Sequence, residues 1–477
     1  MNPHLRAANE AELNAMQLDT DPLADDTIAR ILGPWPAGMP TLDAQQWQAI
    51  ATVNRLLGQW SSNAALQHWR AEGEGVTPAM AQALQDYVAQ GQVLPPWADH
   101  RKIERAEQLF MQHGALSCIL LFCSSLPECY VIPDLSSVLH TTGQLEQHTE
   151  YRIRATAAMI FPVMLLGGLT QPSGSGVAQV LKVRLIHATV RNLILRGKPQ
   201  DARSRIRDNG VLPPLPLTGA AATSMHQVLY ARGWDLAQGA PCNQEELAYT
   251  LLTFGYVFLR SMRKLGMGLL PADEEAYLHA WNVVGYVLGI DPALMVQNMH
   301  QGESLMAQMQ ARGRAQPVQP DPRPALGAAL MQTMSQAIPW SIAKPFPPLM
   351  TRYLCGAQTA KDLGLDSKQI PWLSRCAFWC VMLAARVVDD VVQAMLPRFS
   401  LTRALVRIVG YHFMSRVLMN QTRPLQLPDQ LLNQMDDTMA SWSDDPHAPD
   451  WLNRLEDRFT TAGQWSLRRK APAGTPT

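Results

Sequence analysis

The sequence predicts an all-α protein. Apolar residues recur at helical spacing along almost the whole chain of 477 residues, while alternating β-branched runs bounded by turns are scarce. Hydrophobic residues make up 47% of the chain and charged residues only 17%, below the roughly 25% usual for soluble domains. A chain of this length and composition is expected to bury a large helical core.

Breaks in composition divide the chain into four parts. Residues 1–90 form an N-terminal helical extension, in which "GPWPAGMP" and "AEGEGVTP" separate modest helices. Residues 91–314 contain longer and more apolar helices and are expected to form the functional core. After the Pro-rich stretch "AQPVQPDPRPALG", residues 315–470 continue as a helical region that packs on this core, and 471–477 form a disordered tail.

Two helices late in the core are delimited by their own residues. Asn243 and Glu246 form a capping-box pattern before an apolar stripe that ends at Gly266, after a basic last turn with Arg260, Arg263 and Lys264. Asp273 is then expected to cap a second helix that ends at Gly289. The sequence therefore predicts one helix over 243–266 and another over 273–289.

Composition also argues against several classes of partner. Lysine plus arginine and aspartate plus glutamate both number 40, so no net field attracts nucleic acid or an anionic membrane. The seven cysteines form no CxxC pair, which argues against a disulfide framework or a zinc ribbon. We therefore expect an apolar small-molecule partner and no nucleic acid.

The sequence shows no targeting or membrane signal. The N-terminus lacks a basic region followed by an apolar run, which predicts a cytoplasmic location. The nearest approach to a membrane span is "ATAAMIFPVMLLGGL", residues 155–169, which is short and interrupted by Pro162 and a glycine pair. It is expected to form core rather than a transmembrane segment.

The stretch "KVRLIHATVR" places one histidine between two arginines inside an apolar helix that begins after a Ser/Gly loop at 173–176 and ends at Gly197. Arg184 and Arg191 lie near the face of His187, one turn below and one above it. A single histidine is a poor zinc or di-iron site, but haem needs only one axial ligand and cations for its propionates. From the residues alone, a core histidine bonded to a backbone carbonyl, with both arginines extending to solvent, remains the commoner arrangement.

Six segments, taken in their order and spacing, resemble the latex-clearing protein family, the bacterial rubber oxygenases, and the related MpaB-type oxygenase catalytic domains. The resemblance covers about 94–295 and extends more weakly to about 365. The segments are "PPWADHRKI" (95–103), "SLPECY" (125–130), "TTGQLEQHTEYRIRAT" (141–156), "KVRLIHATVR" (182–191), "NQEELAYTLLTFGYVFLRSMRKLG" (243–266) and "EAYLHAWNVVGYVLGI" (275–290).

The resemblance implies a globin-like helical core that holds one b-type haem, with His187 as the proximal iron ligand. It also implies that Arg152 and Thr156, the Arg-x-x-x-Thr pair of "RIRAT", line the haem pocket and hydrogen-bond bound oxygen. Helical geometry adds the expectation that Arg184 or Arg191 pairs with a haem propionate.

This chain departs from the rubber-cleaving members at the distal side of the implied haem. Ala155 stands where those members carry a lysine able to bind the iron, so the sixth position is expected to be open or held by water. None of Glu128, Glu146 and Glu150 falls on the motif of their glutamate base. Together with the missing secretion signal, these departures count against solid polyisoprene as the substrate.

The function predicted from the sequence is that of a haem b-dependent oxygenase. It would use dioxygen on an apolar, unsaturated, isoprenoid-like substrate and cleave a carbon–carbon double bond to carbonyl products. Two alternatives remain open: a haem-binding sensor or carrier without turnover, and a helical interaction protein without a cofactor.

Overall fold

The structure is a computed structural model that describes residues 9–35, 44–132, 149–205, 211–217, 224–316, 319–338, 340–367 and 369–395. Within these ranges, the side chains of 44, 115, 149–155, 203–205, 337 and 384–395 lie outside the description. The prediction of a disordered tail at 471–477 also lies outside the described residues.

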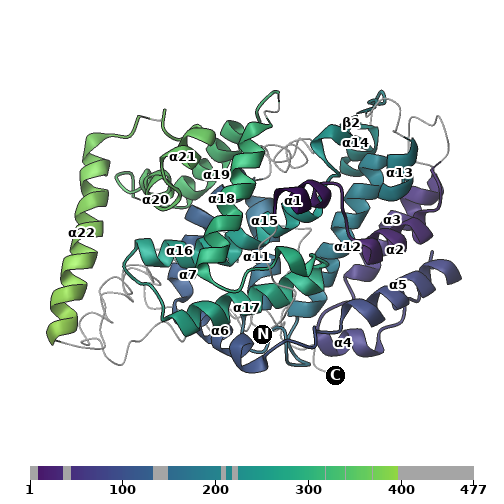
Figure 1. Ribbon diagram of the computed structural model, residues 1–477, viewed down its shortest axis with the longest axis horizontal. Coiled ribbons are helices and arrows are strands. Elements are labelled where there is room, and N and C mark those ends of the chain that lie inside the picture. The colour runs from purple at the N-terminus through teal and green to yellow at the C-terminus, as the bar shows by residue number, and fades with distance from the viewer. Residues whose placement is uncertain are drawn as a thin grey trace, which may run out of the picture.

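The described chain is almost entirely helical, which confirms the all-α prediction (Figure 1). One short antiparallel pair, β1 with β2, is the exception among the described residues. The helices before the site are α1 (Glu10–Met16), α2 (Pro22–Leu32), α3 (Ala44–Leu57), α4 (Asn63–His68), α5 (Pro78–Gly91), α6 (His100–Gln112), α7 (Gly114–Leu120), η1 (Leu121–Ser125) and α8 (Leu126–Cys129). The next elements are α11 (Thr149–Met164), α12 (Gly176–Leu195), α13 (Pro199–Arg205), β1 (Val211–Leu212), α14 (Met225–Ala231), β2 (Trp234–Asp235) and η3 (Leu236–Gln238). The remainder are α15 (Gln244–Phe254), α16 (Tyr256–Lys264), α17 (Pro271–Leu288), η4 (Pro292–Leu294), α18 (Met299–Ala315), α19 (Arg323–Ala337), α20 (Phe346–Cys355), α21 (Ala357–Asp362) and α22 (Trp372–Met395).

Helix α12 is the centre of the fold. It packs against α2, α11, α14 and α17, which enclose it on most sides (Figure 1). Its apolar residues Val180, Leu181, Leu185 and Leu193 are fully buried. Its observed extent agrees with the prediction from the Ser/Gly loop and Gly197, because glycine and serine interrupt the helical pattern at both ends.

The N-terminal helices belong to this core. The Tyr87 hydroxyl on α5 donates to the Leu181 carbonyl of α12 at 2.7 Å, and Gly91 lets α5 approach so closely that a Cβ there would lie 2.7 Å from Leu181 Cδ2. Beyond the end of α2, Trp35 Nε1 donates to Asn192 Oδ1 of α12 at 2.8 Å. Residues predicted as an extension thus form one wall around the central helix.

Two predicted helix boundaries were wrong. The helix expected over 243–266 is divided into α15 and α16 at Gly255, where ψ is −78° and the glycine lowers the cost of leaving helical geometry. The helix expected from Asp273 begins at Pro271, because proline has no N–H to leave unsatisfied in a first turn. The caps at Asn243 and Gly289 are confirmed.

A tight glycine-rich turn joins α11 to α12. A Cβ at Gly174 would lie 2.2 Å from the Gly167 carbonyl oxygen, and one at Gly168 would lie 2.1 Å from that of Pro162. Two side chains from earlier helices hold the turn: Asn63 Nδ2 donates to the Gly168 carbonyl at 2.9 Å, and Glu107 Oε2 accepts from Gly167 N at 2.8 Å. The turn therefore fixes the angle between the two helices that carry the predicted site residues.

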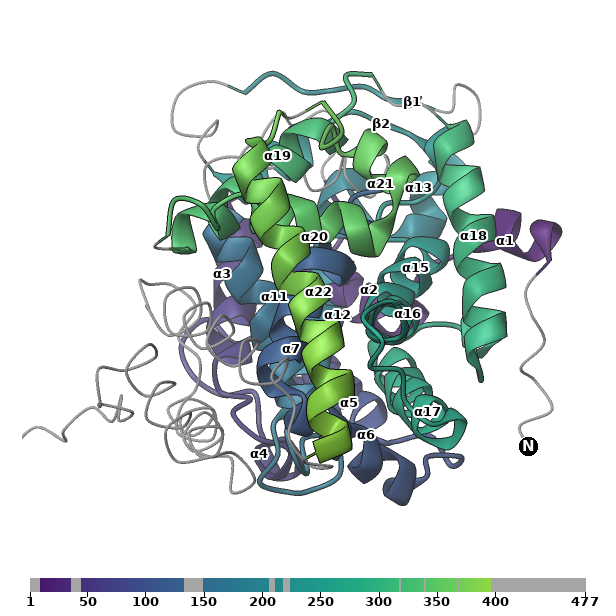
Figure 2. The same ribbon diagram turned by 90° about the vertical axis from the view of Figure 1, so that its left-hand side faces the viewer.

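Helix α22 runs along one edge of the described molecule in Figure 1, lies across the face turned to the viewer in Figure 2, and contacts the rest chiefly through α20. Its Phe378 is buried and meets Phe346 edge to face, while the outward residues are apolar and exposed. These exposed residues are Trp372, Leu373, Trp379, Val381 and Leu383, with Cys376 and Cys380 between them.

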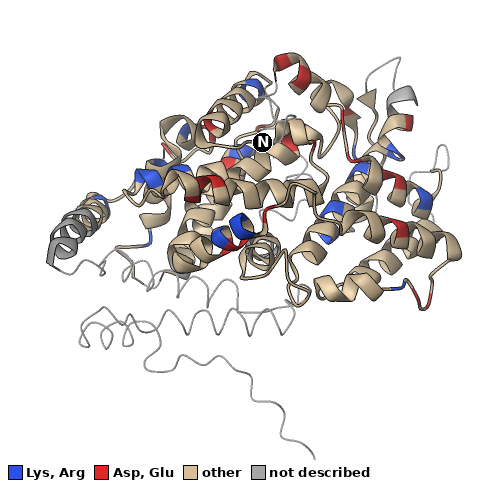
Figure 3. Cartoon of the chain, turned by 60° about the horizontal axis from the view of Figure 1, so that its bottom comes forward, with Lys and Arg blue, Asp and Glu red and all other residues tan. Residues whose placement is uncertain are grey.

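Among the helices that the structure describes, none is by itself long and apolar enough to cross a membrane. One pair that bends by 92°, His100–Gln112 with Leu116–Cys129, meets that test only when its two parts are taken together, by length and composition. Basic and acidic residues are interspersed over the described helices (Figure 3).

Candidate functional site

His187 lies in the middle of α12 and is only partly exposed. Its Nδ1 atom is buried, and the imidazole has no hydrogen-bond partner in the described part of the chain. Burial, together with the nearby positive charge of Arg191, lowers the pKa of His187 to about 4. The side chain is therefore neutral at physiological pH, which is the form that binds a metal.

The two arginines that flank this histidine have carboxylate partners from α2. Arg184 binds Asp21 through two bonds, Nε to Oδ2 at 2.5 Å and Nη2 to Oδ1 at 2.7 Å, and its Nη1 donates to the Val287 carbonyl at 3.0 Å. Its guanidinium is thus satisfied by groups of the protein itself. The expected pairing of Arg184 with a propionate stays a prediction.

Arg191 is fully buried and makes the second contact with α2. Its Nε donates to Asp25 Oδ1 at 2.8 Å, and its Nη1 donates to the Cys242 carbonyl at 3.0 Å. Burial raises the pKa of Asp25, while the adjacent Arg191 opposes that rise. Neither Arg184 nor Arg191 extends to solvent, so the arrangement that sequence reasoning left open, with snorkelling arginines, is wrong.

Asp21 and Asp25 are structural residues of the site that sequence reasoning missed. Their spacing of four residues on α2, "DPLAD", places both carboxylates on one helical face, and this spacing was the available signal. It could not identify their partners, which lie 163 and 166 residues further along the chain.

The other two predicted residues lie on α11, which packs against α12. Thr156 is half-buried. The side chain of Arg152 lies outside the described residues, as does that of Ala155, although both positions fall within the helix. Their roles in the pocket stay predictions.

A half-exposed stripe runs along α12 beside His187. Val183 and Val190 are partly exposed on it, and Ile186 retains 46% of its surface although it belongs to the central helix. Lys182 stands at the N-terminal end of this stripe. Together with the neutral imidazole, these residues offer an apolar surface with one metal-ligating atom at its edge.

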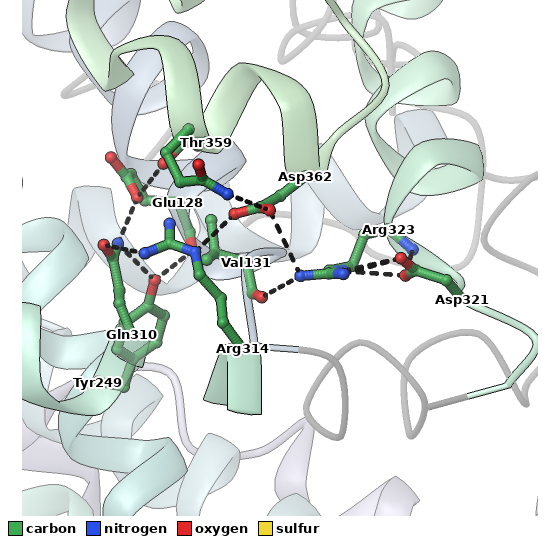
Figure 4. A network of polar contacts seen from close by, with 10 residues as sticks. Glu128, Val131, Tyr249, Gln310, Arg314, Asp321, Arg323, Thr359 and Asp362 are labelled. Carbon is green, nitrogen blue, oxygen red and sulfur yellow. Dashed lines mark hydrogen bonds and ion pairs between the residues drawn. The ribbon is translucent and has the colours of Figure 1, made fainter. Parts of the chain in front are cut away.

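Glu128 has both carboxylate oxygens engaged by the protein, and Figure 4 shows the contacts of Oε2 with Gln310 and Thr359. Oε1 accepts from Arg260 Nη2 at 2.6 Å, and Oε2 accepts from Gln310 Nε2 at 2.7 Å and from the Thr359 hydroxyl at 3.3 Å. The side chain is fully buried, so Glu128 joins α16, α18 and α21 around α8 as a structural anion. Glu146 and the side chain of Glu150 lie outside the described residues.

The polar network continues beyond Gln310. Its Oε1 accepts from Arg314 Nη1 at 3.3 Å, and Arg314 Nε donates to Asp362 at 2.8 Å (Figure 4). Arg323, which binds Asp321, lies 3.8 Å from the same Asp362. These pairs hold α18, α19 and α21 together.

A haem fits the donor set around His187 better than a bare metal ion does. In the described ranges no three histidine, cysteine, aspartate or glutamate side chains lie close enough to hold a metal ion. His279 is engaged elsewhere, because its Nε2 accepts from Asp99 N at 2.9 Å. A single neutral imidazole with no hydrogen-bond partner, beside an apolar stripe, matches a planar cofactor that needs one axial ligand.

Comparisons with known proteins place the chain in a family. A family model described as "ER-bound oxygenase mpaB/B'/Rubber oxygenase, catalytic domain" matches residues 132–389, which is more than half of the chain. The rubber oxygenase of Streptomyces sp. (strain K30) is 23% identical over 232 residues. That alignment spans 48% of this chain and 48% of the relative, about half the length of each.

A solved structure of latex clearing protein LCP in the closed state shares the fold. It superposes with a TM-score of 0.55 at 18% identity, over 89% of this chain and 90% of that one. The shared fold therefore extends beyond the segment that the family model matches. The chain belongs to the family of the ER-bound oxygenases mpaB/B' and rubber oxygenase catalytic domains.

Proposed function

We propose that this protein is a haem b-dependent oxygenase that uses dioxygen to oxidise an apolar, unsaturated, isoprenoid-like substrate. The proposal includes cleavage of a carbon–carbon double bond to carbonyl products as the reaction. Membership of an oxygenase family supports the class of activity. Haem, the substrate class and the bond cleaved are inferred from the site and the resemblance.

The single observation that carries the proposal is the state of His187. A buried imidazole nitrogen without a hydrogen bond costs free energy, which a bond to iron would offset. The lowered pKa keeps the ring neutral and ready to ligate at physiological pH. We therefore propose His187 as the proximal ligand of the haem iron.

The other residues would shape the pocket around this ligand. Val183, Ile186 and Val190 would cover one part of the apolar ring and exclude water from it. Thr156 and Arg152, on the neighbouring helix, would bind and orient oxygen by hydrogen bonds. When bound, haem supplies the activation of dioxygen, a chemistry that amino-acid side chains do not provide.

An absorption spectrum of the purified protein tests the cofactor. We expect a Soret band after expression with adequate haem, and we expect the His187→Ala variant to lose or shift that band because its axial ligand is gone. The matched control is His279→Ala, whose histidine bonds to the backbone on another helix. Unchanged haem binding in His187→Ala would reject the assignment.

Oxygen uptake then separates the oxygenase from a haem sensor or carrier. The haem-loaded protein should consume oxygen in turnover when given alkenes or isoprenoids, and mass spectrometry should find carbonyl products. A sensor would consume none. Should the wild-type protein take up no haem at all, the cofactor-free interaction protein becomes the better hypothesis.

A further inference from the structure

Four cationic side chains belong to α12 and its C-cap, and three of them have acceptors. Arg184 and Arg191 bind the carboxylates of α2. Arg196 donates to the carbonyls of Tyr230 and Pro213 at 3.0 and 2.8 Å. Lys182 has no hydrogen-bond or ion-pair partner among the residues that the structure describes.

The environment of Lys182 makes this lack of a partner costly. The side chain is half-buried, and burial lowers its pKa to about 8, with no opposing carboxylate among the described residues. An ammonium group that is drawn out of water without an anion is unfavourable. A ligand that brings a carboxylate to this position would remove the penalty.

Lys182 and His187 lie on neighbouring ridges of the same helix. Lys182, Ile186 and Val190 follow one another at intervals of four residues, and Val183 and His187 form the adjacent row. The step of five residues from Lys182 to His187 spans about 7.5 Å along the axis and turns about 140° around it. Lys182 and His187 therefore lie at opposite edges of the half-exposed face, with Val183, Ile186 and Val190 between them.

We propose that Lys182 binds a carboxylate of the haem propionates, the role that sequence reasoning gave to Arg184 or Arg191. This inference rests on the proposed function, since it assigns a residue for the same cofactor. If His187 holds the haem, Ile186 would cover part of its apolar ring and the ammonium group of Lys182 would pair with a propionate carboxylate. The two arginines instead hold α12 to α2.

The test compares haem b with its dimethyl ester, in which both propionates are neutral. Apoprotein is titrated with each compound, and binding is followed by the Soret band and by the rise in melting temperature. We expect Lys182→Gln to bind haem b roughly ten- to a hundredfold more weakly, as expected for loss of a charge-assisted hydrogen bond. Affinity for the ester should not change, because the ester offers no anion to Lys182.

Two further variants make the result specific. Lys182→Arg should restore most of the preference for haem b over the ester, because it keeps the positive charge. Lys361→Gln, which removes an exposed lysine on α21, should behave as wild type. Without ligand, Lys182→Gln should melt at or above the wild-type temperature, since the half-buried charge is gone.

The outcomes separate this inference from the proposed function. If Lys182→Gln keeps the wild-type preference for haem b, or weakens haem b and the ester equally, the assignment of Lys182 is overturned while haem binding at His187 stands. If the wild-type protein gives no Soret band with either compound, the proposed function fails and this inference fails with it.

Discussion

Arg191 and Asp25 show how much a single buried pair can depend on both of its members. The Arg191 side chain is 0% exposed and that of Asp25 1%, so neither charge has access to water. Taking two charges out of water is expensive, and their mutual attraction offsets that cost only while both are present. Removing one leaves an uncompensated charge in the core.

We therefore expect Asp25→Ala to lower the free energy of unfolding by about 3–5 kcal/mol, measured by urea denaturation. The double variant Asp25→Leu/Arg191→Met should recover much of that loss, because it removes both charges and keeps apolar volume. The control is Asp86→Ala on the Arg30–Asp86 pair, which joins α2 to α5 but is exposed, so its loss should change stability little. Equal losses at the two sites would contradict the argument from burial.

The buried carboxyl group of Glu107 is expected to make the stability of the protein depend on pH. Burial raises the pKa of the Glu107 carboxyl group to about 7, although the hydrogen bond that it accepts from Gly167 N partly opposes the rise. The folded state therefore keeps a proton on Glu107 that the unfolded state releases near pH 4.5. The contribution of this group to the free energy of unfolding is fully present below pH 4.5 and is lost as the pH rises to about 7. This difference in pKa between the folded and unfolded states corresponds to a loss of about 3 kcal/mol in the free energy of unfolding.

Glu107→Gln should abolish that fall and keep an oxygen acceptor for Gly167 N. The variant is expected to be more stable than wild type at pH 8 and nearly equal to it at pH 4.5, as measured by urea denaturation across this range. Glu275→Gln, an exposed change on α17, serves as the control. A constant difference between Glu107→Gln and wild type at every pH would show that the carboxyl group does not titrate in this window.

At the scale of elements, the turn between α11 and α12 sets the relative position of Thr156 and His187. Three of its glycines approach carbonyl oxygens so closely that a side chain cannot be accommodated without movement. Asn63 and Glu107, from α4 and α6, then hold the turn by hydrogen bonds to its backbone.

Gly174→Ala is accordingly expected to destabilise the protein by more than 1 kcal/mol and to weaken haem binding, because the methyl group would force α11 and α12 apart. Thermal melting and Soret titration measure the two effects. Gly255→Ala is the control: a Cβ there meets its nearest atom at 3.5 Å, and no strained φ is involved. That variant should retain haem binding.

The elements also show what sequence patterns could and could not predict. The bounds of α12 were predictable because glycine and serine mark both of its ends, and Gly289 was predictable as a C-cap for the same reason. The division of the next helix at Gly255 was not, because an isolated glycine within a helical pattern is often tolerated.

For the candidate site, too, local patterns were informative and contacts between distant residues were not. His187 could be singled out as a candidate because the arginines beside it and the family resemblance both lie within its own helix. The partners of Arg184 and Arg191 were not found, because Asp21 and Asp25 belong to a segment that appeared to be an extension. Contacts between residues distant in sequence leave no local pattern that one sequence can reveal.

For the molecule as a whole, the match to the family model begins at residue 132, but the buried core already includes Leu13 of α1. Asp21, Asp25, Trp35 and Tyr87 all contact α12, the first two by salt bridges and the others by hydrogen bonds. The segment that the family model matches therefore does not cover the central helix α12 without the N-terminal helices.

A fragment of residues 132–389 is expected not to fold cooperatively, because it would leave two buried guanidinium groups and the apolar face of α12 uncovered. Circular dichroism during heating should show a broad transition or none, whereas residues 9–395 should give a single sharp one. A cooperative transition of the short fragment at the temperature of the longer chain would refute this view.

The salt bridges between α2 and α12 have a consequence for the order in which the protein folds. Asp21 is synthesised 163 residues before Arg184. At a rate of synthesis of about 5–20 residues per second, roughly 8 to 30 s pass before its partner has been added to the chain. Throughout that time α2 can bury its apolar face only against helices made early, such as α5. The central helix therefore cannot complete its charge pairs as a local event, and its assembly is a late, long-range step of folding.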